Sequence, residues 1–288
     1  MRFGLIANLH QFGAGDIVTV FLEWARKGNH EVIISDEHRQ IGDDFNTYLP
    51  RDAIASKVDI VVSMGGDGTL LASARAVGVE CTPLLGVNLG SLGFLTQLTP
   101  KQLTYALDAI VAGDYQIEER MLLKATVEGG QQLAQPYALN DIVVDKGAIS
   151  RLIEICFRVN DENIVTYRAD GIVIATPTGS TAYSLAVGGP IMHPKMMGII
   201  ASPISSFSLS TRPMVFDADD VLELTVKSED RVVGLTLDGQ VMTSLLDTAR
   251  VTITRAEFTA RFIIFPENSF FKVLRNKLHW GVPPLTER

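Results

Sequence analysis

The feature that most constrains the fold is an almost unbroken apolar run, VDIVVSM at residues 58–64, that leads directly into Gly65 and Gly66. The run lacks the alternation of a half-buried strand and is typical of a central parallel strand covered on both faces. Segments that resemble strands and helices alternate around it. Further strands are predicted at 2–8, 31–35 and 83–88, and helices at 16–27, 69–77 and 100–113. Strands separated by helices indicate an open parallel sheet, so we predict an α/β domain over residues 1–113.

The pattern changes at about residue 114, after which short strand-like segments follow one another between turn signals. In one of them Ile153, Ile155, Phe157 and Val159 share a face, while polar residues share the other. This alternation favours an antiparallel, layered β-rich domain, which we place at residues 114–265. The strand-like segments lie at 121–129, 138–146, 151–161, 163–177, 221–228, 231–240 and 250–258. The last segment, 267–280, is predicted to be helical.

The charge balance excludes some classes of protein. The chain has 25 basic and 33 acidic residues, a net charge of −8, which disfavours a general nucleic-acid binder. An anionic substrate must therefore be held by local groups, because the field of the whole protein repels it. Two cysteines cannot build a disulfide framework or a four-ligand metal site. No secretory segment is recognisable at the N-terminus, and we expect a cytoplasmic protein.

Residues 171–194 contain no Asp, Glu, Lys or Arg. Several prolines and glycines interrupt the stretch before it reaches the roughly 20 apolar residues of a membrane-spanning helix, so no membrane association is predicted. We expect this region to be buried, or to be lined by backbone and hydroxyl groups.

The strongest local motif is Gly65-Gly66-Asp67-Gly68-Thr69, between the buried strand and a helix. Ligands of open α/β sheets bind beyond the carboxyl ends of the strands, and the first N–H groups of the helix suit a phosphate. A carboxylate makes little sense in an anion site unless it accepts a proton or holds a metal ion. The alternative is a tight turn in which Asp67 caps the helix.

Three further motifs are weaker. After Asp170, the segment TPTGSTAYS at 176–184 places hydroxyls and glycine after a strand, where they could bind ribose and phosphate without net charge; the alternative is an ordinary polar turn. Asn140-Asp141 could bind a ribose diol, although a turn between strands is the more common use of such a pair. The triplet at 238–240, Asp-Gly-Gln, is typical of a hairpin turn. There is no P-loop, the glycines near residue 13 make a poor dinucleotide fingerprint, and the five histidines lack metal-site spacing.

Together these motifs resemble those of NAD kinases over most of the chain. TPTGSTAY followed by GGPI is the most specific part, because turns similar to GGDGT also occur in lipid kinases and phosphofructokinases. The matching blocks are GGDGT at 65–69, LGFL at 92–95, LND at 139–141, DGIVIATPTGSTAYSLAVGGPI at 170–191, SLSTRP at 208–213 and DGQ at 238–240.

The resemblance implies an α/β domain followed by a β-rich domain, with the helix of residues 266–288 returning to the first domain. It implies transfer of the γ-phosphoryl of ATP to the 2′-hydroxyl of the adenosine ribose of NAD, with Mg²⁺ or a similar ion bound through the ATP phosphates. It also implies a homo-oligomer, dimer or tetramer, whose neighbouring subunits could complete the site.

The resemblance also assigns roles to individual residues. Asp67 would be the general base and would line the NAD site with Gly68. Asn140 and Asp141 would hold adenine and ribose, and Asp170 the nicotinamide amide. Arg151 and Arg168 would lie near the phosphates or the ribose, and Gln240 would close the site. The segment that packs along the dinucleotide, with Tyr183 stacked on a ring, would be Thr181, Ala182, Tyr183, Ser184, Leu185 and Ala186.

Two residues depart from the family pattern. Asp141 stands where the family usually has Glu, which sets its carboxylate one methylene further back. Phe207 stands where the family usually has His, and any polar role of that histidine is lost.

Two other functions are possible from the motifs. A related kinase acting on a lipid alcohol would need an apolar groove, whereas residues 171–194 offer hydroxyls and glycines. A non-catalytic NAD-binding regulator would have no need of a proton acceptor at Asp67. Either NAD or NADH as acceptor, either ATP or polyphosphate as donor, and inhibition by NADP or NADPH are all compatible with the sequence.

Overall fold

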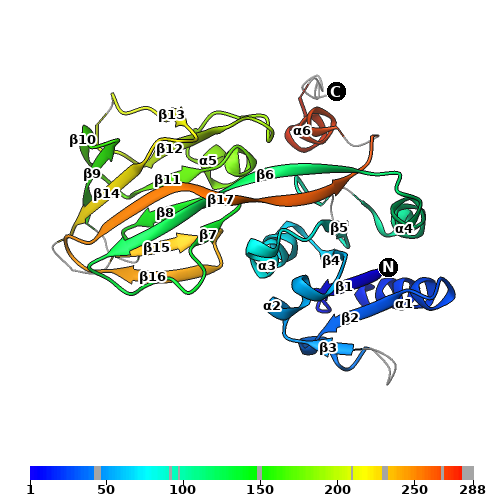
Figure 1. Cartoon of the computed structure of the whole chain (residues 1–288). Helices are drawn as coiled ribbons and strands as arrows, with labels where there is room; N and C mark the ends of the chain where they lie inside the picture. Colours follow the sequence, from blue (N-terminus) through cyan, green and yellow to red (C-terminus); the bar gives the residue numbers. More distant parts are fainter. Residues whose placement is uncertain are drawn as a thin grey trace. The chain divides into compact units, whose positions relative to one another are not determined.

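A computed structural model describes residues 1–41, 47–90, 93–96, 98–147, 151–208, 210–228, 233–266 and 269–280. The chain divides into two compact units, each with its own hydrophobic core (Figure 1). Unit 1 comprises Met1–Glu118 and Arg261–Arg288, and unit 2 comprises Glu119–Ala260. The chain leaves unit 1 within strand β6 (Gln116–Glu128) and returns to it within strand β17 (Arg250–Ile264).

Unit 1 is built on a parallel sheet whose strand order is β3-β2-β1-β4-β5. The end of β17 adds a further parallel pairing, between Phe262 and Leu84 of β5. The strand order reverses between β1 and β4, which is the position where ligands bind in doubly wound sheets. The bounds are β1 Arg2–Ala7, β2 Glu31–Ser35, β3 Thr47–Leu49, β4 Ile60–Gly65 and β5 Leu84–Asn88.

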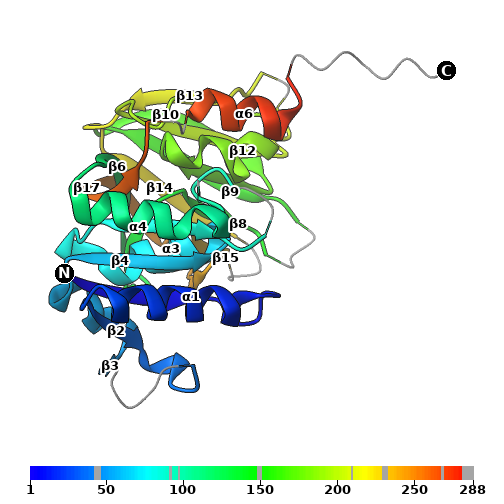
Figure 2. The ribbon, with the colours of Figure 1, turned by 90° about the vertical axis from the view of Figure 1, so that its right-hand side faces the viewer.

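Helices cover both faces of this sheet. Helices α1 (Ala14–Lys27) and α4 (Leu103–Ala112), both labelled in Figure 2, contribute their buried residues to one core with the strands. The two helices are joined where Trp24 Nε1 donates to Asp108 at 2.7 Å. Helices α2 (Arg51–Ile54) and α3 (Asp67–Val77) pack on the opposite face. All six residues of β4 are buried, as the apolar run predicts. Helix α6 (Phe270–Leu278) belongs to the same unit.

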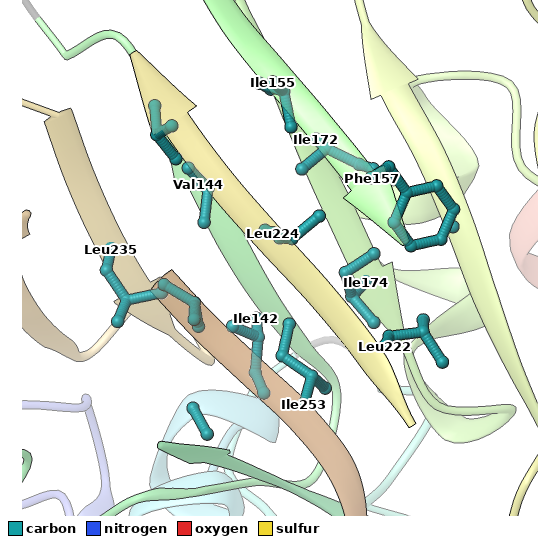
Figure 3. Packing of buried hydrophobic residues seen from close by; sticks show 14 of the residues in the cluster. Ile142, Val144, Ile155, Phe157, Ile172, Ile174, Leu222, Leu224, Leu235 and Ile253 are labelled. Carbon is teal, nitrogen blue, oxygen red and sulfur yellow. The ribbon is translucent and has the colours of Figure 1, made fainter. Parts of the chain in front are cut away.

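Unit 2 contains two layers of antiparallel strands. One sheet has the order β13-β12-β11-β8-β15-β16, and the facing layer has the order β10-β9-β14-β17. Ile142, Ile172 and Leu235 of the first sheet meet Phe157 and Leu224 of the second in a closely packed core (Figure 3). The bounds are β8 Asp141–Asp145, β9 Ile153–Val159, β10 Glu162–Ala169, β11 Gly171–Ala175, β12 Gly198–Ile204, β13 Met214–Asp217, β14 Leu222–Lys227, β15 Val233–Leu237 and β16 Val241–Leu245; the two-residue strand β7 (Tyr137–Ala138) pairs with β6.

The charge-free stretch covers the outer face of the six-stranded sheet. Residues 171–180 are all buried, and β11 occupies a central position between β8 and β12. After β11 the chain forms a short 3-10 turn (Thr178–Thr181) and helix α5 (Tyr183–Ala186). Met192 then packs against Val143, Val173 and Ile200 on that outer face. Burial therefore explains the missing charges of residues 171–180, while Tyr183, Ala186, Gly188 and Pro190 are exposed.

The predicted fold class, an α/β part with a parallel sheet and a layered antiparallel β-rich part, is confirmed. The alternating face of Ile153, Ile155, Phe157 and Val159 is buried as expected. Four strands were not predicted: β3, β12, β13 and β16. In the part of the chain that the structure describes, no helix has both the length and the apolar character needed to cross a membrane.

Candidate active site

The GGDGT motif lies at the carboxyl end of β4, beside the point where the strand order of unit 1 reverses. Gly66 is the N-cap of α3, in an extended conformation, and Asp67 is the first residue of the helix. Gly65 is required because a methyl group there would overlap the Thr69 side chain. Asp67 is thus inside the helix and is not its N-cap, and among the described residues its carboxylate bonds to residues 94–96 and not to the first N–H groups of α3, so the alternative of a simple helix cap is not what the structure shows.

Instead, the Asp67 carboxylate binds the loop of the LGFL block. Its Oδ2 accepts from the Phe94 N–H at 2.8 Å. Its Oδ1 accepts from the Leu95 N–H at 3.1 Å, the Thr96 N–H at 3.0 Å and the Thr96 hydroxyl at 3.0 Å. Gly93 lies so close that a methyl group there would overlap the carboxylate. Four donors fix the orientation of a charged group that sits at the start of a helix.

A second polar side chain lies at this end of the sheet. Gln11 follows β1, and its amide group lies beside Gly66 and Gly90. Its amide nitrogen would be 3.9 Å from a Cβ added to Gly66 and 3.8 Å from a Cβ added to Gly90. Its Oε1 atom is buried without a hydrogen-bond partner among the described residues. A buried amide oxygen without a donor is costly, so this atom suits a donor supplied by a ligand.

In unit 2, three of the predicted motifs meet around the segment 139–141. The Asp238 carboxylate accepts hydrogen bonds from three successive N–H groups: Leu139 at 3.0 Å, Asn140 at 2.7 Å and Asp141 at 3.2 Å. Asp238 and Gly239 have φ values of 52° and 65°, in the left-handed region, and they turn the chain between β15 and β16. The hairpin turn predicted at 238–240 is therefore confirmed, and its aspartate also holds the Asn140-Asp141 pair.

The TPTGS loop packs against the same segment from the other side. The Thr176 N–H donates to the Asn140 carbonyl at 2.9 Å, and the Thr176 hydroxyl donates to the Leu139 carbonyl at 2.6 Å. The Gly179 N–H donates to the Thr176 hydroxyl at 3.0 Å, and a methyl group on Gly179 would overlap the backbone of Asn140. The Ser180 hydroxyl is buried and bonded to the backbone of Pro177. The inner hydroxyls of this loop are thus part of its scaffold.

Asp141 is 5% exposed, and its carboxylate accepts the backbone N–H of Tyr183. Burial, together with the nearby charge of Asp238, raises the pKa of Asp141 to about 7. Because Asp238 receives three N–H donors, its negative charge is the better stabilised of the two. The proton of this carboxyl pair therefore resides on Asp141.

We expect this burial to make stability depend on pH. Below about pH 4 Asp141 is protonated in both the folded and the unfolded chain. Between pH 4 and 7 only the unfolded chain releases the proton. The free energy of unfolding therefore falls by up to about 4 kcal/mol as the pH rises through this window. Asp141→Asn removes this pH dependence, because an amide does not titrate. Urea unfolding of both proteins at pH 4.5 and 8 measures their free energies of unfolding. Relative to the wild type, the variant should be more stable at pH 8 than at pH 4.5. An equal difference in the free energy of unfolding at both pH values would contradict the raised pKa of Asp141.

Tyr183 lies beside a group of carboxylates. Its side chain is 43% exposed, and its pKa is raised by burial and by the charges of Asp145, Asp141 and Asp170. Asp170 is itself paired with Lys146, at 2.7 Å. The structure therefore gathers Asn140, Asp141, Asp170 and Tyr183 in one region of unit 2, whereas Asp67 and Gly68 belong to unit 1.

The remaining predicted residues differ in their exposure. Arg168 lines a groove of about 430 Å³ with Tyr167, Phe207 and Arg212, and Phe207 is 81% exposed. Thr181, Ala182 and Leu185 are half-buried, Ser184 is buried, and Arg151, Ala186 and Gln240 are exposed. Leu92, the first residue of the LGFL block, lies outside the described residues.

Sequence reasoning missed Gln11, Asn88, Gly93, Thr96 and Asp238 as site residues. Gly93 and Asp238 stand inside blocks already singled out, which was the available signal. Gln11, Asn88 and Thr96 gave none, because their positions follow from chain folding over long separations.

Comparisons with known proteins match both parts of the chain. Residues 9–115 match the ATP-NAD kinase N-terminal domain, and residues 139–265 match the ATP-NAD kinase C-terminal domain. The NAD kinase of Trichlorobacter lovleyi is 45% identical over 97% of this chain and 99% of its own length, and that of Geotalea daltonii is 43% identical with the same coverage.

Two solved structures are similar over almost the whole chain. Yeast NADH kinase complexed with NADH superposes with a TM-score of 0.91 at 22% identity, covering 100% of this chain and 90% of the yeast chain. An NAD kinase from Archaeoglobus fulgidus in complex with ATP superposes with a TM-score of 0.78 at 25% identity, covering 97% and 99%. The first likeness concerns the fold alone.

Proposed function

The chain belongs to the NAD kinase family, and from this premise we propose how its residues carry out the reaction. The enzyme phosphorylates NAD to NADP with ATP as the phosphoryl donor. In our proposal the 2′-hydroxyl of the adenosine ribose attacks the γ-phosphorus of ATP. A new O–P bond forms, the bond to the bridging oxygen of the β-phosphate breaks, and ADP leaves.

Asp67 takes the proton of the attacking hydroxyl in this proposal. The observation that carries it is the position of the carboxylate: at the N-terminus of α3, beside the switch point, and oriented by donors from residues 94–96. Phosphoryl transfer depends mainly on positioning and charge stabilisation, and a positioned base typically contributes about 10²–10⁴-fold. The Gln11 oxygen at the same end of the sheet, which has no hydrogen-bond partner among the described residues, supports a polar ligand there.

We place NAD against the 139–141 segment and α5. Asn140 and Asp141 would hold adenine and ribose, and Asp170 the nicotinamide amide. The backbone clamp formed by Asp238 supports this assignment, because it presents the Asn140-Asp141 pair in one fixed conformation. Thr181, Ala182, Tyr183, Ser184, Leu185 and Ala186 would pack along the dinucleotide, with Gly68, Arg151, Arg168 and Gln240 at its edges.

We further propose that the donor is the complex of ATP with Mg²⁺, and that the enzyme acts as a cytoplasmic homo-oligomer. The ion would neutralise phosphate charge that a protein of net charge −8 otherwise repels. Sedimentation analysis at several concentrations tests the assembly, and a monomer at all of them would contradict it.

The reaction is tested by incubating the purified protein with ATP, Mg²⁺ and NAD. NADP should accumulate in step with ADP, and ³¹P NMR should place the new phosphate on the 2′-oxygen. Hydrolysis of ATP without NADP would contradict the proposal. Diacylglycerol in place of NAD serves as the control acceptor, and its phosphorylation would favour a lipid kinase instead.

Tyr183→Ala should weaken the binding of NAD. A stacked aromatic ring typically contributes about 0.5–1.5 kcal/mol beyond the area it buries, so the dissociation constant should rise at least several-fold. Tyr183→Phe keeps the ring and should bind nearly as well as the wild type. Calorimetric titration measures both, and equal affinity of the alanine variant would reject the stacking role.

A further inference from the structure

Behind the Asp67 carboxylate, a buried chain of hydrogen bonds continues into the sheet. Thr96 is 1% exposed and Asn88, the last residue of β5, is 2% exposed. The Thr96 hydroxyl lies 3.0 Å from Asp67 Oδ1, and the Asn88 amide nitrogen lies 2.8 Å from the same hydroxyl. The three side chains thus form one line from the strand to the carboxylate.

The direction of these hydrogen bonds is determined by chemistry. The Gly90 N–H lies 2.7 Å from Asn88 Oδ1, and an N–H can only donate, so this atom is the amide oxygen. The other amide atom is therefore the NH₂ group, which donates to the Thr96 oxygen. Since a hydroxyl has a single proton, Thr96 directs that proton toward Asp67.

This chain distinguishes the two oxygens of the Asp67 carboxylate. Oδ1 accepts three donors, from the Leu95 N–H, the Thr96 N–H and the Thr96 hydroxyl, while Oδ2 accepts one, from Phe94. Oδ1 is therefore the anchored oxygen. Oδ2, with fewer donors in the described part of the chain, is the oxygen suited to receive a proton from a substrate.

We propose that Thr96 and Asn88 are positioning residues for Asp67: Asn88 orients the Thr96 hydroxyl, which anchors Oδ1 and leaves Oδ2 to act as the base. The inference rests on the proposed role of Asp67. Both side chains are buried behind the carboxylate, so we expect both to act on the rate of the chemical step more than on the binding of NAD.

The test compares Thr96→Val with Thr96→Ser. Valine keeps the shape but removes the hydroxyl, and loss of one hydrogen bond to a charged group should lower kcat about tenfold, with the KM for NAD within about twofold. Serine restores the donor and should recover kcat to within about threefold of the wild type. Thr82→Val is the matched control, because Thr82 is a buried threonine of the same unit whose hydroxyl donates to the Ala55 carbonyl. It should lose stability without losing kcat.

Asn88→Ala tests the second link. It should lower kcat in the wild-type background and have no further effect in Thr96→Val, because Asn88 acts through the threonine. Thermal melting of each variant shows that it is folded at the assay temperature. Equal losses in both backgrounds, or a Thr96→Val enzyme with wild-type kcat, would overturn the inference.

The outcome also separates this inference from the proposed function. If Asp67→Asn abolishes turnover while Thr96→Val does not, Asp67 remains the base and the positioning chain is wrong. If Asp67→Asn keeps its turnover, the proposed base is wrong, and the chain through Thr96 has no catalytic role.

Discussion

Asp67→Asn should lower kcat by about 10²–10⁴-fold while changing the affinity for NAD only modestly, because an amide cannot take the proton of the attacking hydroxyl. The substitution keeps an oxygen that can accept from Leu95 and Thr96, so the loop of residues 93–96 should retain most of its hydrogen bonds. Steady-state kinetics with ATP, Mg²⁺ and NAD, together with calorimetric titration of NAD, measure the two effects.

Asp114→Asn is the matched control for this experiment. Asp114 is an exposed residue that follows α4, and its variant should keep wild-type turnover. Melting temperatures of both variants exclude unfolding as the cause of lost activity. Turnover of Asp67→Asn within tenfold of the wild type would remove Asp67 from proton transfer.

Gly179→Ala should damage the unit that holds Asn140 and Asp141. The added methyl group overlaps the backbone of Asn140, and backbone atoms cannot rotate away as a flexible side chain can. Forced overpacking typically costs about 1–3 kcal/mol. The shift also disturbs the hydrogen bonds of Thr176 with this segment, so NAD affinity should fall by at least about tenfold.

Gly15→Ala provides the comparison for Gly179→Ala. Gly15 lies in α1, and a Cβ there meets open space, so alanine should leave stability unchanged or raise it by up to about 1 kcal/mol. Urea unfolding measures stability, and calorimetric titration measures NAD affinity. A Gly179→Ala protein with wild-type values of both would show that the TPTGS loop does not support the 139–141 segment.

Much of the fold follows from periodicity. The apolar run at 58–64 identified the central strand β4, and the alternation from Ile153 to Val159 identified the buried face of β9. The absence of charge from 171–194 indicated burial correctly for residues 171–180, because a charged group in the centre of the six-stranded sheet would be unpaired, whereas Tyr183, Ala186, Gly188 and Pro190 are exposed.

The missed strands have physical reasons. β3 and β13 have only three and four residues, too few for a periodic signal. β12 contains a proline, which is uncommon within strands. β16 follows the hairpin turn, and only its last residue, Leu245, is buried.

The sequence motifs named individual residues of the candidate site, but they did not predict the hydrogen bonds that join those residues. The motif around Asp67 pointed to a carboxylate at the mouth of a glycine turn, but the donors at residues 94–96 lie 27 to 29 positions away along the chain. Likewise Asp238 appeared only as a turn residue, although it holds backbone about 100 positions distant. Such contacts depend on strand order, which local periodicity does not reveal.

The most direct measurement is a crystal structure of the enzyme with NAD and a non-hydrolysable ATP analogue bound. We expect Asp67 Oδ2 to lie about 2.6–3.2 Å from the 2′-oxygen of the adenosine ribose, with that oxygen facing the γ-phosphorus. If the bound ribose instead lay beyond hydrogen-bond reach of Asp67, with another group beside its 2′-oxygen, Asp67 would not be the base.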